Sequence, residues 1–167
     1  MPPSHRHQLA AIAKTHELLT RSGIDYWLFG GWAVDFHAGS ITRSHDDIDV
    51  AVWLDDHDRI ALLLSTEGWK HAAEPDEDGG TGYERDAVRL ELTFLVTGDG
   101  GEVYIPLRAG RALWSNEPLG ADFGELSGVR TRVLGLAALK RSKARFRDDP
   151  AEAAKDRADF ATLSQLG

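Results

Sequence analysis

Residues 29–52 read FGGWAVDFHAGSITRSHDDIDVAV, and this stretch decides the fold of the chain. Its last part predicts a strand over residues 47–54 that begins with two acidic residues, Asp47 and Asp49. Side chains two positions apart on a strand point to the same side, so these two carboxylates project together from one face. The apolar residues that alternate with them are expected to form the opposite, buried face: Ile48, Val50, Val52 and Leu54.

The paired carboxylates indicate a metal site. Two neighbouring carboxylates in a poorly hydrated place cannot both stay ionised unless cations neutralise them. Magnesium is the natural candidate, because it binds carboxylate oxygens together with phosphate oxygens. We therefore predict that Asp47 and Asp49 are metal ligands. The alternative for so short a motif is that both residues simply lie at an exposed strand end.

A phosphate-binding arrangement is predicted directly upstream of the two aspartates. Residues 25–29 form an aromatic-rich strand candidate, Gly30 and Gly31 follow it, and a short helix then runs to Gly39. A backbone without Cβ lets a ligand approach closely, and the N-terminus of a helix attracts phosphate groups. The whole stretch therefore predicts a phosphate-binding turn beside a metal-ligand pair.

The remainder of the chain predicts a mixed α/β domain with a helical tail. Hydrophobic periodicity, glycines and turn residues mark its elements. Besides those named, we expect helices over residues 5–22 and 56–66, a weak strand over 69–73, an acidic glycine-rich loop over 74–82, strands within 83–96, a turn at 98–101 before a strand at 102–106, a hairpin around 127–128, and helices over 136–146 and 150–163. We expect residues 1–134 to form the catalytic domain and residues 135–167 a helical segment packed on it.

Composition narrows the function classes. The chain has 167 residues, of which 42% are hydrophobic and 28% charged, as expected for an ordinary globular domain. Without cysteine it has no thiolate metal site, and the lack of an apolar run of about 20 residues leads us to expect a cytoplasmic protein without a membrane span. A formal net charge of −8 disfavours nucleic-acid binding and suits a cationic small-molecule partner.

The stretch over residues 29–52 resembles the signature of the nucleotidyltransferase superfamily with the DNA polymerase β-like fold. It is most similar to the small bacterial nucleotidyltransferases that act on aminoglycosides and lincosamides, which share G-G-W, a short helix and T-R-x-H-x-D-[IL]-D at the same spacing. The resemblance is strong over residues 27–53, moderate to residue 96 and weak beyond. It implies a fold with a mixed central sheet flanked by helices, and transfer of a nucleoside monophosphate to a hydroxyl of a small antibiotic. ATP or another NTP would be the co-substrate, two Mg²⁺ ions would assist, and pyrophosphate would be released.

A third carboxylate is expected, because the attacking hydroxyl needs a base, and the resemblance to the superfamily implies that a later strand supplies it. If the strand within ERDAVRLELTFL is regular, Glu91 lies on its polar face together with Arg89, while Asp86 belongs to the frayed start of the strand. We predict that Glu91 is the base and also a metal ligand, and the resemblance agrees. The alternative is a solvated glutamate on an edge strand.

Basic residues near these positions are candidates for binding the triphosphate. Arg43 and His45 lie on the loop before the aspartates, where Arg43 could grip a phosphate with two hydrogen bonds; His45 could instead hold the turn. Lys143 falls within the apolar stripe of a helix that also includes Phe146, and Lys140 borders it. Lysines at such places usually extend outward, so one of them, or Lys155, could reach the nucleotide.

The acceptor is less well defined than the nucleotide. The acidic loop, with Asp35, Asp55 and Asp56, adds negative potential that favours an aminoglycoside over a lincosamide, and the loop itself is either a lid or merely solvated. Other interpretations are a nucleotidyltransferase that modifies a tRNA or a protein, as toxin–antitoxin relatives do, and an inactive nucleotide-binding module. A glycosyltransferase would need a longer chain. Because the helical tail is short, a homodimer is one way to complete the cleft.

Overall fold

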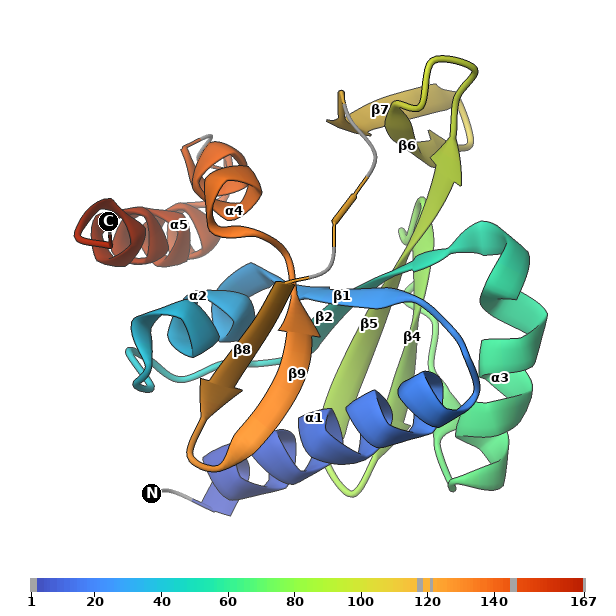
Figure 1. The fold of residues 1–167 in the computed structure, drawn as a ribbon, viewed down its shortest axis with the longest axis horizontal. Helices are drawn as coiled ribbons and strands as arrows, with labels where there is room; N and C mark the ends of the chain where they lie inside the picture. Colours follow the sequence, from blue (N-terminus) through green and yellow to red (C-terminus); the bar gives the residue numbers. More distant parts are fainter. Residues whose placement is uncertain (1–2, 117–118, 121, 145–146, 167) are drawn as a thin grey trace.

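A mixed β-sheet forms the centre of the fold (Figure 1). The computed structural model describes residues 3–116, 119–120, 122–144 and 147–166. The strands of the sheet are β1 (Tyr26–Phe29), β2 (Ile48–Trp53), β3 (Lys70–His71), β4 (Gly80–Arg85), β5 (Val88–Thr97), β6 (Val103–Leu107), β7 (Gly110–Ser115), β8 (Asp122–Leu126) and β9 (Val129–Val133). Their main order is β3-β4-β5-β2-β1-β9-β8. Strand β2 is parallel to β5, and β1 to β9, whereas the other pairs are antiparallel.

The helices account for the rest of the described architecture. They are α1 (Pro3–Arg21), α2 (Gly30–Ala38), α3 (His57–Thr66), α4 (Leu136–Lys143) and α5 (Pro150–Ser164), with a short 3-10 helix at Leu54–Asp56. Helix α5 begins where the sequence predicted, because Pro150 is its first residue and the carboxylate of Asp149 accepts hydrogen bonds from the N–H groups of Ala151 and Glu152. None of the helices among the described residues has the length and apolarity to cross a membrane.

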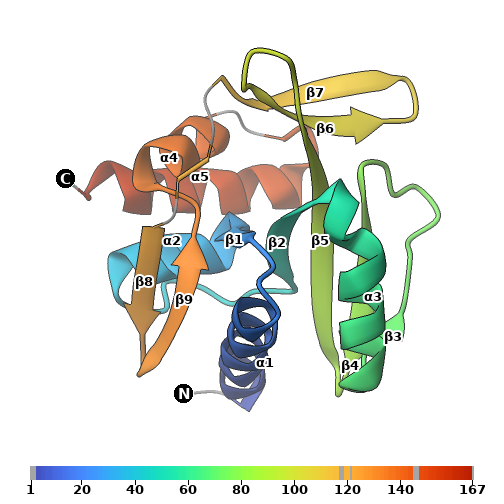
Figure 2. The same cartoon turned by 45° about the vertical axis from the view of Figure 1, so that its right-hand side comes forward.

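The main core lies between the sheet and helices α1, α2 and α3 (Figure 2). Strand β2 contributes Ile48, Val50 and Val52 to it, as the alternating pattern predicted. Leu54 departs from the prediction, because the strand ends at Trp53 and the chain turns into the 3-10 helix, which leaves Leu54 38% exposed. The opposite face of the sheet carries a smaller core that β6 covers: Trp27, Ala51, Leu95 and Val103.

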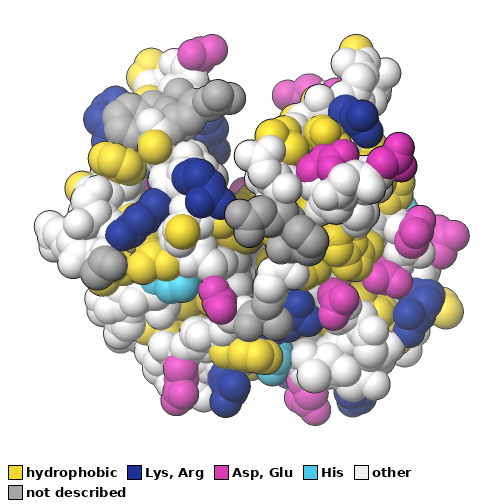
Figure 3. Space-filling model, turned by 45° about the horizontal axis from the view of Figure 1, so that its top comes forward, with side chains coloured by type: hydrophobic (Ala, Val, Ile, Leu, Met, Phe, Trp, Pro, Cys, Tyr) yellow, Lys and Arg dark blue, Asp and Glu magenta, His cyan; other side chains and the backbone are white. Residues whose placement is uncertain are grey.

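The C-terminal helices α4 and α5 pack against each other and against α2. They therefore stand beside the edge of the sheet at which β1 ends and α2 begins (Figure 2). On the other side of this edge, the β6–β7 hairpin extends beyond the end of β5. The space-filling view shows the surface hollowed between these two raised parts (Figure 3).

Several boundaries differ from the sequence-based expectation. Strand β4 already begins at Gly80, so the acidic loop is shorter than predicted. Strand β7 was not anticipated, since its residues GRALWS show no clear alternation. Helix α4 ends at Lys143 and Ala144 caps it, so the helix is shorter than predicted; residues 145–146 of the predicted helix, including Phe146, lie outside the described residues.

Candidate functional site

A cavity of about 310 Å³ lies where the end of β1, the start of β2 and helices α4 and α5 meet. Aromatic rings form one part of its wall, because Phe29 and Trp114 pack edge to face with their centroids 5.0 Å apart. Charged side chains of both signs form the rest. The residues lining the cavity are Phe29, Gly30, Gly31, Arg43, His45, Asp46, Asp47, Asp49, Trp114, Ser142, Lys143, Arg147, Glu152, Lys155 and Asp156.

Gly30 allows the carboxylate of Asp49 to lie against the start of α2. The two strands pair so that Phe29 is opposite Asp49, which brings the next residue, Gly30, under the aspartate side chain. Gly30 has a φ of +68°, and a Cβ atom at this position would clash with Oδ2 of Asp49. Both the backbone conformation and the close approach therefore require glycine here.

Asp47 and Asp49 form the electrostatic centre of the cavity. Burial raises the pKa of Asp49 to about 8, and the neighbouring Asp47 carboxylate adds to the effect. Burial, followed by the charge of Asp46, also raises the pKa of Asp47. Such carboxylates bind a divalent cation readily, because the cation removes the repulsion and replaces the lost hydration. The chemistry of this pair therefore fits Mg²⁺.

Glu91 lies on the strand next to this pair. In the parallel pairing of β2 and β5, Glu91 is opposite Asp49, so strand register brings the two predicted residues together. Its carboxylate contacts Nε of Arg89 at 2.5 Å, and burial raises its pKa although Arg89 acts in the opposite direction. Asp86 lies in the β4–β5 turn with a φ of +50°, and its side chain is 88% exposed. Among the described residues, no group of three or more acidic, histidine or cysteine side chains is already arranged to hold a metal ion.

The second glycine, Gly31, makes room for protein side chains. A Cβ atom at Gly31 would clash with the guanidinium of Arg43 and with the ring of His45. The sequence assigned Gly31 only the close approach of a phosphate, whereas the structure adds that the loop before β2 folds over this residue. Substitution of Gly31 would therefore disturb the loop as well as a bound ligand.

His45 holds the loop before β2 in place through two contacts. Its Nε2 contacts Oδ2 of Asp35 at 2.5 Å, and its carbonyl oxygen accepts a hydrogen bond from Gln8. Asp35 also accepts hydrogen bonds from the N–H and hydroxyl groups of Thr42 and is fully buried. The expectation that Asp35 adds to the surface potential is therefore wrong, because its charge is enclosed by its partners.

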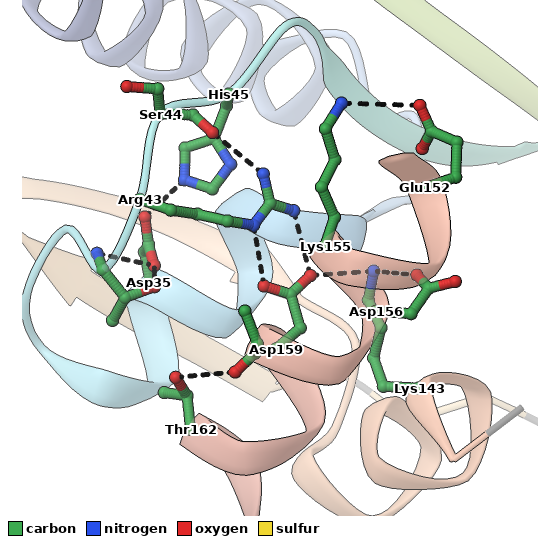
Figure 4. A network of polar contacts seen from close by, with 12 residues as sticks. Asp35, Arg43, Ser44, His45, Lys143, Glu152, Lys155, Asp156, Asp159 and Thr162 are labelled. Atoms are coloured by element: carbon green, nitrogen blue, oxygen red, sulfur yellow. Dashed lines mark hydrogen bonds and ion pairs between the residues drawn. The ribbon is translucent and has the colours of Figure 1, made fainter. Parts of the chain in front are cut away.

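Arg43 and Lys143 reach the cavity wall, but both are paired with aspartates of α5 (Figure 4). Nε and one terminal nitrogen of Arg43 each donate to Asp159, at 2.9 Å. Nζ of Lys143 lies 2.9 Å from Asp159 and 3.5 Å from Asp156. Both predicted phosphate-binding cations are therefore held in fixed positions by one buried carboxylate, that of Asp159.

The other two lysines that were candidates for nucleotide binding lie in different places in the fold. Lys155 lines the cavity and forms an ion pair with Asp46 at 2.5 Å. Lys140 points elsewhere and donates a hydrogen bond to the carbonyl oxygen of Leu166 at the end of the chain.

Sequence reasoning missed Asp156 and Asp159. Both are almost fully buried, and both lie on the stripe of α5 that packs inward with Ala153 and Leu163. Aspartates at the inward positions of an amphipathic helix need charged partners, because an unpaired buried charge is costly. The spacing of 153, 156, 159 and 163 was visible in the sequence and could have revealed them. Arg147, which contacts Asp156 through its backbone nitrogen and two guanidinium nitrogens, was also not predicted as a site residue.

Gly30→Ala is expected to reduce nucleotidyl transfer strongly, because the added Cβ displaces the Asp49 carboxylate. The matched control is Gly39→Ala: Gly39 ends α2 with a φ of +75°, and a Cβ there meets no atom within 4 Å. Both variants carry the cost of about 1–2 kcal/mol for an L-residue in a left-handed conformation. Turnover and thermal unfolding of the two proteins separate the effects. Equal activity of both variants would contradict the proposed contact between Gly30 and Asp49.

Known proteins resemble this chain in sequence over a short segment and in fold over most of its length. A 44-residue segment is 43% identical to a 2''-aminoglycoside nucleotidyltransferase of Klebsiella pneumoniae, and covers 26% of this chain and 22% of that protein. A 43-residue segment is 40% identical to a protein of the same description from Escherichia coli, with 26% and 24% covered. These matches span less than a quarter of the curated relatives.

Solved structures agree in fold. The structure of ANT(2'')-Ia in complex with adenylyl-2''-tobramycin superimposes with a TM-score of 0.71 at 20% identity, and covers 96% of this chain and 90% of that one. The lincomycin-bound lincosamide adenylyltransferase LnuA gives a TM-score of 0.69 at 18% identity, with 92% and 94% covered. The nucleotidyltransferase fold implied by the sequence is thus confirmed. Residues 11–163, which include both aspartates, the glycine turn and the two C-terminal helices, match one family over almost the whole chain, and the protein belongs to the aminoglycoside-2''-adenylyltransferase family.

Proposed function

We propose that this protein transfers the AMP group of ATP to a hydroxyl group of an aminoglycoside and releases pyrophosphate. The observation that carries the proposal is the Asp47–Asp49 pair, which lines a cavity at the N-terminus of α2. The arrangement suits a triphosphate, because a helix N-terminus attracts phosphate groups and paired carboxylates attract the divalent cation that accompanies them. Family membership supports the reaction and the class of acceptor.

The reaction requires one bond to form and one to break. The acceptor oxygen forms a bond to the α-phosphorus of ATP, and the bond from this phosphorus to the oxygen that bridges to the β-phosphate breaks. Pyrophosphate leaves with the electron pair of that bond, and Glu91 accepts the proton of the acceptor hydroxyl. Glu91 suits this role because it lies beside Asp49, and burial makes its carboxylate more basic than usual.

Asp47 and Asp49 would hold Mg²⁺, with Glu91 as a further ligand. When bound there, Mg²⁺ would neutralise charge on the phosphates and on the leaving pyrophosphate. Without a cation, burial and the charge of neighbouring carboxylates disfavour the ionised forms of both aspartates. The two carboxylates therefore suit a site that becomes complete when the metal and the nucleotide bind together.

The triphosphate would lie between the turn at Gly30 and the wall formed by α4 and α5. The free N–H groups at the start of α2 would contact phosphate oxygens. Arg43 and Lys143 would contact the same phosphates. Asp159 already holds both side chains in place, so they would lose no further conformational freedom when the nucleotide binds. His45 would contribute by fixing the loop, since its ring nitrogen is engaged with Asp35.

A lincosamide is the second candidate acceptor, and the structural likeness to the lincomycin-bound adenylyltransferase is the observation that favours it. The net charge of −8 and the acidic residues near Glu91 favour the cationic aminoglycoside instead. Opposite charge increases the local concentration of a substrate and the rate at which it is captured.

The test is pyrophosphate release from each of the four NTPs with a panel of aminoglycosides and lincosamides, in the presence of Mg²⁺. We expect release with ATP and an aminoglycoside, and a product whose mass is increased by one AMP group. Release with lincosamides alone would shift the assignment to the second candidate. If only a tRNA or a protein becomes labelled by radioactive ATP, both small-molecule assignments are wrong.

A further inference from the structure

A second cavity, which we call the side cavity, lies next to the cavity around Asp47 and Asp49. It has a volume of about 300 Å³ and is bounded mainly by β7 and α4, so it belongs to the hollow between the two raised parts of the surface (Figure 3). The described residues that line it are Leu113, Trp114, Leu134, Ala138, Arg141 and Ser142. Trp114 and Ser142 also line the cavity around the aspartates, so the two cavities adjoin at these residues.

The lining of the side cavity is mostly apolar. Two leucines and an alanine contribute to it, and the indole of Trp114 adds a flat aromatic surface. Arg141 is the one charged residue among its described lining residues, and its charge is positive. An acceptor with several ammonium groups would find no opposite charge there. A flat, uncharged ring system would instead bury its apolar faces against this lining.

The indole of Trp114 is held in a defined orientation by Phe29. The two rings pack with their centroids 5.0 Å apart and their planes at 86°. Phe29 is the last residue of β1 and directly precedes Gly30, the first residue of α2. Trp114 is therefore fixed relative to the N-terminus of α2. Because its side chain is only partly buried, part of the ring is available to a ligand.

Helix α4 lines both cavities. Lys143 faces the cavity around the aspartates, Ser142 lines both cavities, and Ala138 lines the side cavity. A ligand that extends along α4 therefore passes from a phosphate-binding cation to an apolar lining. The hydroxyl of Ser142 donates a hydrogen bond to the carbonyl oxygen of Leu139 at 2.9 Å, so its oxygen can still accept one from an amino group of a ligand. A nucleotide presents its groups in this order, from charged phosphates to a flat base.

We propose that the side cavity receives the nucleobase of the nucleoside triphosphate and that the base stacks on Trp114. Every base has a flat π face, so an aromatic side chain can bind it by stacking. Trp114 thus adds affinity for the nucleotide without contact to the reacting atoms. This inference rests on the proposed function, because it requires the triphosphate to bind at the turn that contains Gly30.

The test compares two ligands that share a triphosphate chain and differ in the base. A non-hydrolysable ATP analogue carries the base, and inorganic tripolyphosphate lacks it. Isothermal titration in the presence of Mg²⁺ gives the Kd of each ligand. We expect the wild-type protein to bind the analogue more tightly than tripolyphosphate. Trp114→Ala should weaken binding of the analogue by roughly 5- to 140-fold, the range for loss of one stacked base, and leave binding of tripolyphosphate near the wild-type value.

Two further variants separate stacking from a structural role. Trp114→Phe keeps an aromatic face and should retain most of the affinity for the analogue. Ala138→Phe fills the side cavity from α4 while Trp114 stays in place, so it should weaken binding of the analogue alone, and it decides the question if Trp114→Ala does not fold. Phe123→Ala is the matched control, because it removes an aromatic ring that is 50% exposed and lines neither cavity. It should bind both ligands as the wild-type protein does.

The outcomes distinguish this inference from the proposed function. If the wild-type protein binds neither ligand, the proposed function is wrong and no base reaches the side cavity. If it binds both ligands equally well, or if the Trp114→Ala and Ala138→Phe variants weaken both ligands equally or neither of them, the base lies elsewhere and only this inference is refuted. An unchanged affinity for the analogue together with a raised KM for the acceptor would also refute it, because the side cavity would then belong to the acceptor.

Discussion

Asp49→Asn is expected to abolish nucleotidyl transfer and, in the absence of metal, to stabilise the folded protein. Turnover should fall to a few per cent of the wild-type value or less at saturating Mg²⁺, because the amide cannot replace an anionic ligand. The same change removes a group whose ionised form is disfavoured by burial and by the carboxylate of Asp47. Loss of function and gain of stability in one variant are typical of a residue whose charge is kept for a ligand rather than for the fold.

The stabilisation should depend on pH with a defined sign. Burial raises the pKa of Asp49 in the folded protein to about 8, from an ordinary value of 3.8. Between these values the folded state binds the proton more tightly than the unfolded state does. The free energy of unfolding of the wild-type protein should therefore fall as the pH rises from about 4 to about 8. Each pKa unit corresponds to about 1.4 kcal/mol, so the advantage of the asparagine variant should reach a few kcal/mol near pH 8.

Denaturant unfolding in EDTA at several pH values checks the predicted gain of stability, and the turnover assay checks the predicted loss of activity. Asp55→Asn is the matched control, because it makes the same chemical change at an exposed position shortly after β2. It should leave turnover and the pH dependence of unfolding as they are in the wild-type protein. A catalytically active Asp49→Asn protein would remove Asp49 from the metal site, and a variant that is less stable than wild type at pH 8 would contradict the electrostatic account.

Glu91→Gln is expected to slow AMP transfer by roughly 10²–10⁴-fold, the usual contribution of a general base. Glutamine keeps the size of the side chain and can still accept a hydrogen bond from Arg89, but it cannot take a proton. Affinity for ATP should stay near the wild-type value, since Asp47 and Asp49 line the cavity and Glu91 lies on the neighbouring strand. The rate of the wild-type enzyme should fall as the pH drops through the pKa of Glu91, and this acidic limb should be absent in the variant.

Asp86→Asn is the control for this prediction. Asp86 lies in the turn between β4 and β5 with its side chain exposed, so its substitution should change the rate little. Stopped-flow measurement of a single turnover, with isothermal titration of a non-hydrolysable ATP analogue, separates the chemical step from nucleotide binding. An inactive Asp86→Asn together with an active Glu91→Gln would move the base from Glu91 to Asp86.

The parts of the site that are close in sequence were predictable. The glycine turn, the short helix and the two aspartates lie within residues 29–52, and local rules fix their arrangement: glycine at a tight approach, a helix N-terminus, and alternation along a strand. Glu91 was also accessible, because strand alternation separates it from Asp86 without knowledge of the partner strand. Leu54 and strand β7 were not, since a strand end and an irregular edge hairpin depend on what packs against them.

The surroundings of the predicted residues depended on contacts between distant segments. Arg43 and Lys143 were candidates for phosphate binding, and only the packing of α5 shows that Asp159, 116 positions after Arg43, holds both. Asp35 looked like an exposed acid, and only the folded loop encloses it with Thr42 and His45.

By itself the sequence determined the class of fold, through the order of its elements and the resemblance of residues 27–53. It also predicted the Asp47–Asp49 pair as metal ligands and Glu91 as the base, and these two predictions rest on spacing within one strand. Tertiary structure decided which charges are neutralised and which remain available for a ligand. The pairing of β2 with β5 placed Glu91 beside Asp49, and the packing of α5 paired Arg43 with Asp159. The physical reason is that the energy of a buried charge depends on the partners that other elements bring within a few ångströms, and the linear order of residues does not contain these distances.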